Sequence, residues 1–243
     1  MTGDSEQDAA MITLFQFPPA FNVPNVSPFC LKLETFLRLA GLEYQIKHVV
    51  DPRKGPKGKL PFITLDGKAI ADTAIIMRTL QQYYEFDLDA GLDARGRGWA
   101  VSITRLCDEH LVPLLVYFRW LDESGFRQVR DVMLRSIPAP LRPAVGLFMQ
   151  RKIRGDLAGR GLIRHSREEL LSFARDDLEA LDGMLGDLPF YGGAQPCSAD
   201  AAAYGVLANL VLSTLETPLN DMARSYERLV AYCERMQARV WAS

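Results

Sequence analysis

A fixed order of short strands and helices fills the first ninety residues, and few folds accommodate that order. Apolar runs alternate with one clearly amphipathic stretch, and glycine and proline clusters separate the segments. The pattern predicts strand, helix, strand, loop, a hairpin of two strands, and a final helix. In chain order the segments are 11–17, 29–40, 44–50, 60–65, 68–71 and 74–84.

The first predicted helix has both of its ends marked in the sequence. Ser27 stands where an N-cap would, Pro28 occupies the favoured first helical position, and Gly41 supplies a left-handed stop. Further along, Asp66-Gly67 is a strong signal for a two-residue hairpin turn, and Pro61 lies at the start of the third strand. This combination predicts a thioredoxin-like sheet covered by helices.

The remainder of the chain reads as helical. Residues 86–98 are polar and are interpreted as a linker, and helical periodicity begins at Trp99, with Pro113 marking a kink or break. Ser166 and Glu169 form a capping box that opens a helix running to Leu185. We therefore predict two domains, an α/β domain at 11–86 and an all-helical domain at 99–243.

Charge and cysteine content narrow the function classes. The 28 Lys+Arg nearly balance the 30 Asp+Glu, and this net charge of −2 argues against a nucleic-acid binder. Four scattered cysteines are too few for a disulfide scaffold, and no metal-ligand spacing is present. The first eleven residues have the features of neither a signal nor a transit peptide, and no apolar run would span a membrane. The expected location is the cytoplasm.

Positive charge is concentrated in one part of the helical domain. Residues 127–167 contain ten basic side chains against Asp131 and Asp156. Interleaved apolar residues predict an amphipathic helix after Pro143, which would lie on an anionic membrane surface, form a subunit contact, or present a solvated face.

Three short motifs in this order resemble the glutathione transferase superfamily, most closely its branch of failed-axon-connections and metaxin proteins. Ser27-Pro28-Phe29-Cys30 resembles the active-site turn of glutaredoxins and omega-type transferases, with Ser in place of the first Cys. Leu60-Pro61 resembles the cis-proline before the third strand, and Asp72-Thr73 resembles the acidic-Ser pair that holds the γ-glutamyl end of glutathione. The resemblance covers residues 11 to about 240 and implies a thioredoxin-like domain followed by a helical bundle.

The resemblance implies glutathione as co-substrate and a small electrophile as its partner. Ser27 at a helix N-terminus would stabilise the glutathione thiolate, with Asn25 assisting from the same loop. An ordinary helix cap is the competing interpretation of Ser27, and a buried core thiol is the competing interpretation of Cys30. A peroxidase or reductase that uses Cys30 ranks last, because position 27 lacks the first Cys.

The rest of the implied site comes from two further regions. The resemblance implies that Lys59 and the backbone of Leu60, next to Pro61, bind glutathione. Asp72 and Thr73 would bind its γ-glutamyl end. A solvated loop and an ordinary cap are the simpler interpretations of the lysine and of the acidic pair. The electrophile pocket would be walled by Tyr117, Arg119 and Trp120, for which aromatic core packing is the alternative.

The resemblance leaves a second function class open. On its metaxin side it implies a non-catalytic adaptor that uses the fold for protein or membrane-surface contacts. Superfamily members also commonly form homodimers, so a second copy of the chain is an expected partner. In the helical domain, Asp200 is expected to close a buried capping box, but Cys197 replaces the usual Ser or Thr, so the box is either weakened or shifted to Ser198.

Overall fold

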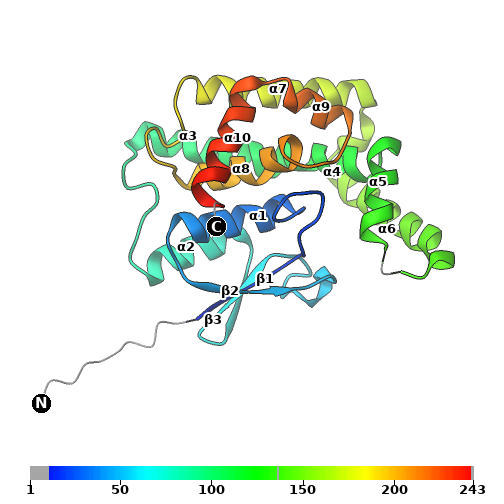
Figure 1. The fold of residues 1–243 in the computed structure, drawn as a ribbon, viewed down its shortest axis with the longest axis horizontal. Helices are drawn as coiled ribbons and strands as arrows, with labels where there is room; N and C mark the ends of the chain where they lie inside the picture. The colour runs from blue at the N-terminus through cyan, green and yellow to red at the C-terminus, as the bar shows by residue number, and fades with distance from the viewer. Residues whose placement is uncertain (1–10, 136, 242–243) are drawn as a thin grey trace, which may run out of the picture.

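The computed structural model describes residues 11–135 and 137–241 of the 243-residue chain. The polar N-terminal segment, for which no targeting peptide is expected, therefore lies outside the described residues apart from Met11. Within the described part, a small sheet and its helices form one layer and a group of helices forms a second (Figure 1). This arrangement confirms the predicted α/β domain followed by an all-helical one.

The N-terminal domain is a four-stranded mixed sheet in the order β2-β1-β3-β4. Strand β1 runs parallel to β2 and antiparallel to β3, and β3 and β4 form the hairpin around Asp66-Gly67. The elements are β1 (Ile12–Gln16), α1 (Pro28–Leu39), β2 (Tyr44–His48), a 3-10 turn (Pro52–Lys54), β3 (Phe62–Leu65), β4 (Lys68–Ala71) and α2 (Thr73–Tyr83). Each predicted segment of this domain is therefore found, with shifts of one or two residues at most ends.

The helical domain begins earlier than predicted. Helix α3 starts at Ala94 inside the segment interpreted as a linker, because the Asp93 carboxylate accepts a hydrogen bond from the Gly96 amide and caps it. The helices are α3 (Ala94–Arg105), α4 (Val112–Trp120), α5 (Glu123–Met133), α6 (Arg142–Gly159), α7 (Arg167–Leu185), α8 (Ser198–Val211), α9 (Pro218–Arg224) and α10 (Glu227–Val240), with short 3-10 turns at Ala139–Leu141 and Leu162–Arg164.

A π-helical segment, Leu106–Leu111, joins α3 to α4 and ends two residues before Pro113, the residue at which the sequence predicted a kink or break. Pro113 follows it in the first turn of α4, where its missing N–H costs no hydrogen bond within that helix. The Ser166–Glu169 capping box predicted for α7 is present, with both reciprocal hydrogen bonds formed.

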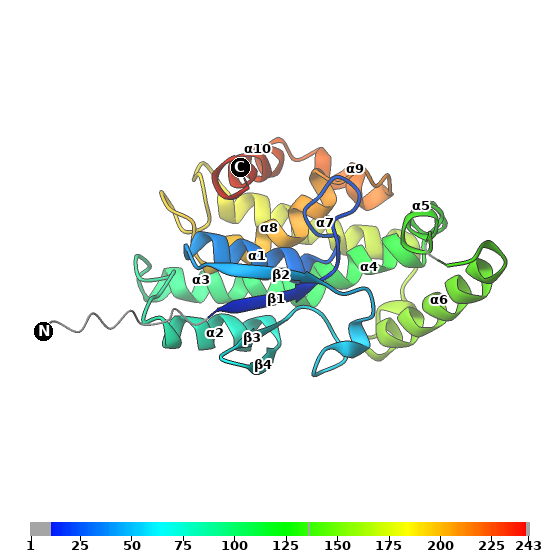
Figure 2. The ribbon, with the colours of Figure 1, turned by 60° about the horizontal axis from the view of Figure 1, so that its bottom comes forward.

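Helix α8 lies between the two domains and is buried along its whole length. Its Ala201 belongs to the core beneath the sheet, whereas Leu31 of α1 belongs to the core of the helical domain. Gly205 permits the close approach, since a Cβ there would lie 2.6 Å from the carbonyl oxygen of Pro28. The two domains therefore share one interface built from α1 and α8, which lie side by side (Figures 1 and 2).

The basic segment differs from its prediction. Helix α6 starts at Arg142 rather than after Pro143, and its apolar residues do not form one buried face. Of its residues only Gly146 and Leu157 are buried, whereas Leu147 and Phe148 are 61% and 67% exposed. Figures 1 and 2 show α5 and α6 extending away from the body of the helical domain, so α6 has few neighbours to bury an apolar stripe.

Candidate functional site

The three sequence motifs meet at one end of the sheet. A buried cluster contains Cys30 of α1, Leu60 and Phe62 on either side of Pro61, and Ala71, the residue before Asp72. The Leu60-Pro61 peptide bond is cis, as the resemblance implied, and Phe62 pairs with Ala71 across the hairpin. Segments that lie up to 45 positions apart in the chain, from Ser27 to Asp72, thus border a single site.

Ser27 is the N-cap of α1. Its hydroxyl oxygen accepts a hydrogen bond from the Cys30 amide at 3.4 Å, and the side chain is partly exposed. The hydroxyl hydrogen remains available to donate to an anion, and the α1 N-terminus adds its positive dipole there. This end of α1 is therefore suited to holding a thiolate.

Cys30 is not a nucleophile in this geometry. Its side chain is fully buried, and burial raises the pKa of the thiol to about 12, with the hydrogen bond to Ser27 opposing that rise only in part. The thiol is therefore protonated at neutral pH, and the core-thiol interpretation of Cys30 is the one that the structure favours.

Asn25 supports the loop rather than facing a ligand, which corrects its expected catalytic assistance. The side chain is fully buried, its Nδ2 donates to the Phe17 carbonyl at 2.6 Å, and its Oδ1 accepts from the Ser27 amide at 3.0 Å. Both ends of the amide are thus used to fix the backbone on either side of Ser27's turn.

Arg119 is likewise not a pocket wall, which corrects a second expectation. Its guanidinium is buried and donates to the Val26 carbonyl and, at 3.1 Å, to Oδ1 of Asn209. Burial lowers the pKa of Arg119 to about 10, so the group still carries its charge at neutral pH. Arg119 fastens the residue next to Ser27 to the helical domain.

Asn209 is a supporting residue that the sequence reading did not single out. Its Nδ2 donates to the carbonyl of Asn25 at 3.1 Å, so α8 and α4 together hold two consecutive carbonyls before Ser27. The signal was visible as a lone amide in the apolar helix AAAYGVLANLV, since a buried amide must find hydrogen-bond partners.

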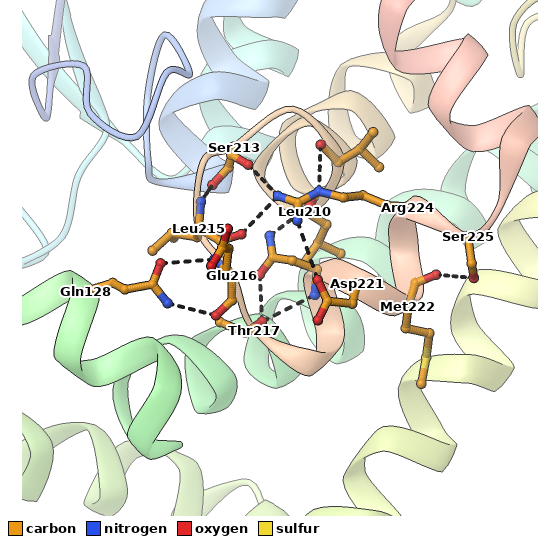
Figure 3. A network of polar contacts seen from close by, with 12 residues as sticks. Gln128, Leu210, Ser213, Leu215, Glu216, Thr217, Asp221, Met222, Arg224 and Ser225 are labelled. Carbon is orange, nitrogen blue, oxygen red and sulfur yellow. Dashed lines mark hydrogen bonds and ion pairs between the residues drawn. The ribbon is translucent and has the colours of Figure 1, made fainter.

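A polar network lies at the C-terminal end of α8, between the turn that follows it and helix α9 (Figure 3). Helix α8 ends at Val211, and the guanidinium of Arg224 donates to the carbonyl of Val211 and to those of Ser213 and Leu215 beyond it. The Thr214 amide in this turn donates to the Phe21 carbonyl at 3.0 Å. The turn after α8 is thereby joined to the loop that carries Ser27.

The acidic pair lies at the start of α2. Asp72 caps the helix, with its carboxylate accepting from the Ala74 and Ile75 amides at 3.0 and 3.3 Å. Its φ angle of +84° is unusual for a residue with a side chain, and such backbone strain is concentrated at functional sites. Thr73 follows and is mostly buried, whereas Asp72 is exposed beside it.

The remaining predicted residues lie outside the buried cluster of Cys30, Leu60, Phe62 and Ala71. Lys59 is exposed and pairs with Asp156 of α6 at 3.7 Å, which joins the loop before β3 to the helical domain. Figure 2 shows α6 next to this loop. Tyr117 and Trp120, in the last turn of α4, are both partly exposed, so their role as pocket walls stays a prediction. Among the described residues, no cluster of His, Cys, Asp and Glu could hold a metal ion.

The expected capping box of α8 is built around Asp200. This fully buried carboxylate accepts from the backbone amides of Tyr191, Gly192 and Cys197, and from the Tyr232 hydroxyl at 3.1 Å. Ser198 does not take over the cap, because its hydroxyl and amide both bind the Asp89 carboxylate at 2.8 Å. The capping box therefore stays at Cys197, and its stronger hydrogen bond is the one from the Cys197 amide to the Asp200 carboxylate at 2.8 Å.

Comparison with known proteins agrees with this geometry. Residues 28–125 match the family described as glutathione S-transferase N-terminal domain, and residues 174–236 match its C-terminal domain. A beta-etherase structure from Sphingobium sp. superposes with a TM-score of 0.62 at 17% identity, covering 93% of this chain and 95% of that one. No helix in the described part of the chain is long and apolar enough to cross a membrane.

Three relatives place the chain within the superfamily. It is 34% identical to Failed axon connections of Drosophila melanogaster over 93% of its own length, although it spans only 57% of that relative. It is 29% identical to an isoprene-epoxide glutathione S-transferase of Rhodococcus sp., covering 93% of this chain and 98% of the relative. It is 30% identical to metaxin-1 of Mus musculus, covering 93% and 74%. The chain therefore belongs to the glutathione S-transferase superfamily, in its metaxin-like branch.

Proposed function

We propose that the protein binds glutathione at the Ser27 end of the sheet and activates its thiol for attack on a small electrophile. The observation that carries the proposal is the convergence of Ser27, the cis Leu60-Pro61 bond and Asp72-Thr73 around one buried cluster. The helix N-terminus suits a thiolate, and the start of α2 offers the Asp72 carboxylate and the Thr73 hydroxyl to a zwitterionic amino-acid end group.

The proposed reaction joins the two substrates, with the protein holding the thiolate and water supplying a proton. The glutathione sulfur, held as thiolate by the Ser27 hydroxyl and the α1 dipole, forms a C–S bond to the electrophilic carbon. With an epoxide, the C–O bond breaks and its oxygen takes a proton from water. The isoprene-epoxide transferase among the relatives supports this class of electrophile. Rate enhancement would come from the lowered thiol pKa and from proximity.

The test is a calorimetric titration with glutathione, followed by conjugation assays on Ser27→Ala. Binding only to the native state should add about 2.7 kcal/mol to the free energy of unfolding at a hundredfold Kd. Losing one charge-assisted hydrogen bond to the thiolate should lower turnover of isoprene epoxide or 1-chloro-2,4-dinitrobenzene by roughly 10–100-fold.

Ser166→Ala is the matched control, because Ser166 also caps a helix but lies on α7. Both variants should lose about 1 kcal/mol of stability, but only Ser27→Ala should lose turnover. Equal turnover in the two variants would reduce Ser27 to a helix cap.

A non-catalytic adaptor is the second candidate, supported by the relatives Failed axon connections and metaxin-1. Thr73 in place of Ser is mostly buried, and the Asp72 carboxylate already caps its own helix, so the glutathione site would be vestigial under this proposal. An absence of heat and of thermal stabilisation with millimolar glutathione would favour the adaptor. Either proposal retains the cytoplasmic location expected from the sequence.

The proposal includes a homodimer formed through α2 and α3. These helices enclose a groove of about 200 Å³, and exposed apolar side chains beside it include Ile75, Trp99 and Val101. Val101 is 60% exposed, so Val101→Arg should convert dimers to monomers in sedimentation velocity. Val50→Arg, at a 72% exposed position in the N-terminal domain, is the control. A monomeric unmodified chain, or equal behaviour of both variants, would refute this interface.

A further inference from the structure

A second cavity lies between the end of α4 and helix α6. Its volume is about 300 Å³, and its lining is apolar on one part and cationic on another: Leu121, Leu147, Gln150, Arg151 and Arg154. Leu147, Arg151 and Arg154 stand four and then three positions apart on α6, so they share one face of that helix. The cavity therefore combines two leucines with two guanidiniums.

The two arginines are electrostatically unmatched. No acidic residue lines the cavity, and within the described residues neither Arg151 nor Arg154 has an ion pair or hydrogen-bond partner. Two other cations of the same basic segment are engaged: Arg160 pairs with Glu109 at 3.0 Å, and Arg167 pairs with Asp122 at 2.6 Å. Lys152 and Arg164, within the described residues, are unpaired like Arg151 and Arg154, but they lie outside the cavity lining. A pair of free guanidiniums beside an apolar wall is complementary to an oxyanion on an apolar body.

Contacts at both walls of this cavity link it to the segments that carry the candidate site. Leu121 follows Arg119 by two residues, and the guanidinium of Arg119 binds the carbonyl of Val26, the neighbour of Ser27. Gln150 donates to the Trp120 carbonyl at 3.0 Å, which fixes α6 to the end of α4. On the other side, the Lys59–Asp156 pair joins α6 to the residue before Leu60.

We propose that the α4–α6 cavity binds the anionic end of the electrophile, so that the substrates are apolar electrophiles bearing a carboxylate or phosphate group. The inference rests on the proposed function for the reaction, and it adds the class of substrate. Arg151 and Arg154 bind the oxyanion, while Leu121 and Leu147 contact the apolar body. The cavity is open to solvent, with Leu147, Arg151 and Arg154 exposed, and its volume of about 300 Å³ is at the lower end of the range for small-molecule sites, which favours a small molecule over a flat lipid surface.

The first experiment measures binding without glutathione. Octanoate and octyl phosphate should bind saturably in calorimetry, and octanol should bind about tenfold more weakly because it lacks the charge-assisted contacts. Arg151→Gln/Arg154→Gln should lose about tenfold in octanoate affinity. Lys152→Gln/Arg164→Gln changes the charge equally, removes exposed side chains outside the cavity lining, and should leave octanoate binding unaltered.

Equal binding of octanoate and octanol, or equal losses in the two double variants, would overturn the proposal. So would vesicles of phosphatidylglycerol that bind through Arg151 and Arg154 while octanoate does not, because the arginines would then serve a lipid surface.

The second experiment separates this inference from the glutathione site. The ratio of kcat/KM for 4-chloro-3-nitrobenzoate over 1-chloro-2,4-dinitrobenzene should fall about tenfold in Arg151→Gln/Arg154→Gln and stay constant in the control. Glutathione binding is measured separately. If glutathione did not bind, the proposed function would be refuted, but the octanoate titration would still test whether the α4–α6 cavity binds an anion. If glutathione bound and the ratio stayed constant, only the anionic substrate class would be refuted.

Discussion

Replacing Asp200 with alanine should lower the free energy of unfolding by roughly 3–5 kcal/mol, among the largest effects of any single substitution in this chain. The carboxylate accepts from three backbone amides and one tyrosine hydroxyl while fully buried. Truncation leaves the three backbone amides without their acceptor in a buried region, whereas the Tyr232 hydroxyl keeps its second hydrogen bond, to the Asp200 carbonyl at 3.2 Å. Urea denaturation followed by tryptophan fluorescence measures the loss.

Two further variants test the Asp200 prediction, one conservative and one a control. Asp200→Asn keeps one carbonyl acceptor in the same shape and should cost less than Asp200→Ala. Asp187→Ala removes an exposed carboxylate nearby, after α7, and should change stability by no more than about 0.5 kcal/mol. If Asp200→Ala matched Asp187→Ala, the buried network would contribute nothing to stability.

The second large effect concerns the buried ion pair between the domains. Lys32 of α1 donates to Asp108 of the π-helical segment at 2.6 Å, and the two side chains are only 2% and 9% exposed. Lys32→Met leaves Asp108 as an uncompensated buried charge and should cost roughly 3–5 kcal/mol. Lys32→Met/Asp108→Leu removes both charges, so it should recover most of that loss.

The pH dependence of Lys32→Met gives a second readout. Burial raises the pKa of Asp108, and the Lys32 ammonium opposes this rise, so the variant should have a still higher Asp108 pKa. A carboxyl whose folded pKa lies above its unfolded value binds more protons in the native state. Relative to the unmodified protein, the variant should therefore regain stability as the pH falls and lose it as the pH rises.

An exposed ion pair supplies the control for the buried one. Arg97 and Asp87 lie 2.8 Å apart with side chains 46% and 41% exposed, so Arg97→Met should cost less than about 1 kcal/mol. Equal costs for Lys32→Met and Arg97→Met, or a double variant no better than Lys32→Met, would contradict the assignment.

The elements of the N-terminal domain were predictable because their signals are local. The cap at Ser27, the Asp66-Gly67 turn and the apolar periods each act within a few residues, and the structure confirms them. The start of α3 at Ala94 was not predicted, because the two glycines in its first turns have low helix propensity. The helix begins there because Asp93 caps it.

Site residues were predicted less well, because their roles depend on contacts distant in the chain. Asn25 and Arg119 were assigned to a ligand, yet each is turned toward backbone carbonyls that only the folded chain brings near. Arg119 and Val26 are separated by 93 positions, and no local pattern encodes such a pair. The lone amide of Asn209 was the one readable sign of this support.

The exchange of core residues between α1 and α8 has a consequence during protein synthesis. Leu31 of α1 is buried in a core completed by residues beyond 197, and Ala201 completes the core under the sheet. A ribosome that has made the whole N-terminal domain must add more than a hundred residues before α8 can cover it. During that interval α1 exposes an apolar face, so the nascent chain is most exposed to aggregation and chaperone capture then.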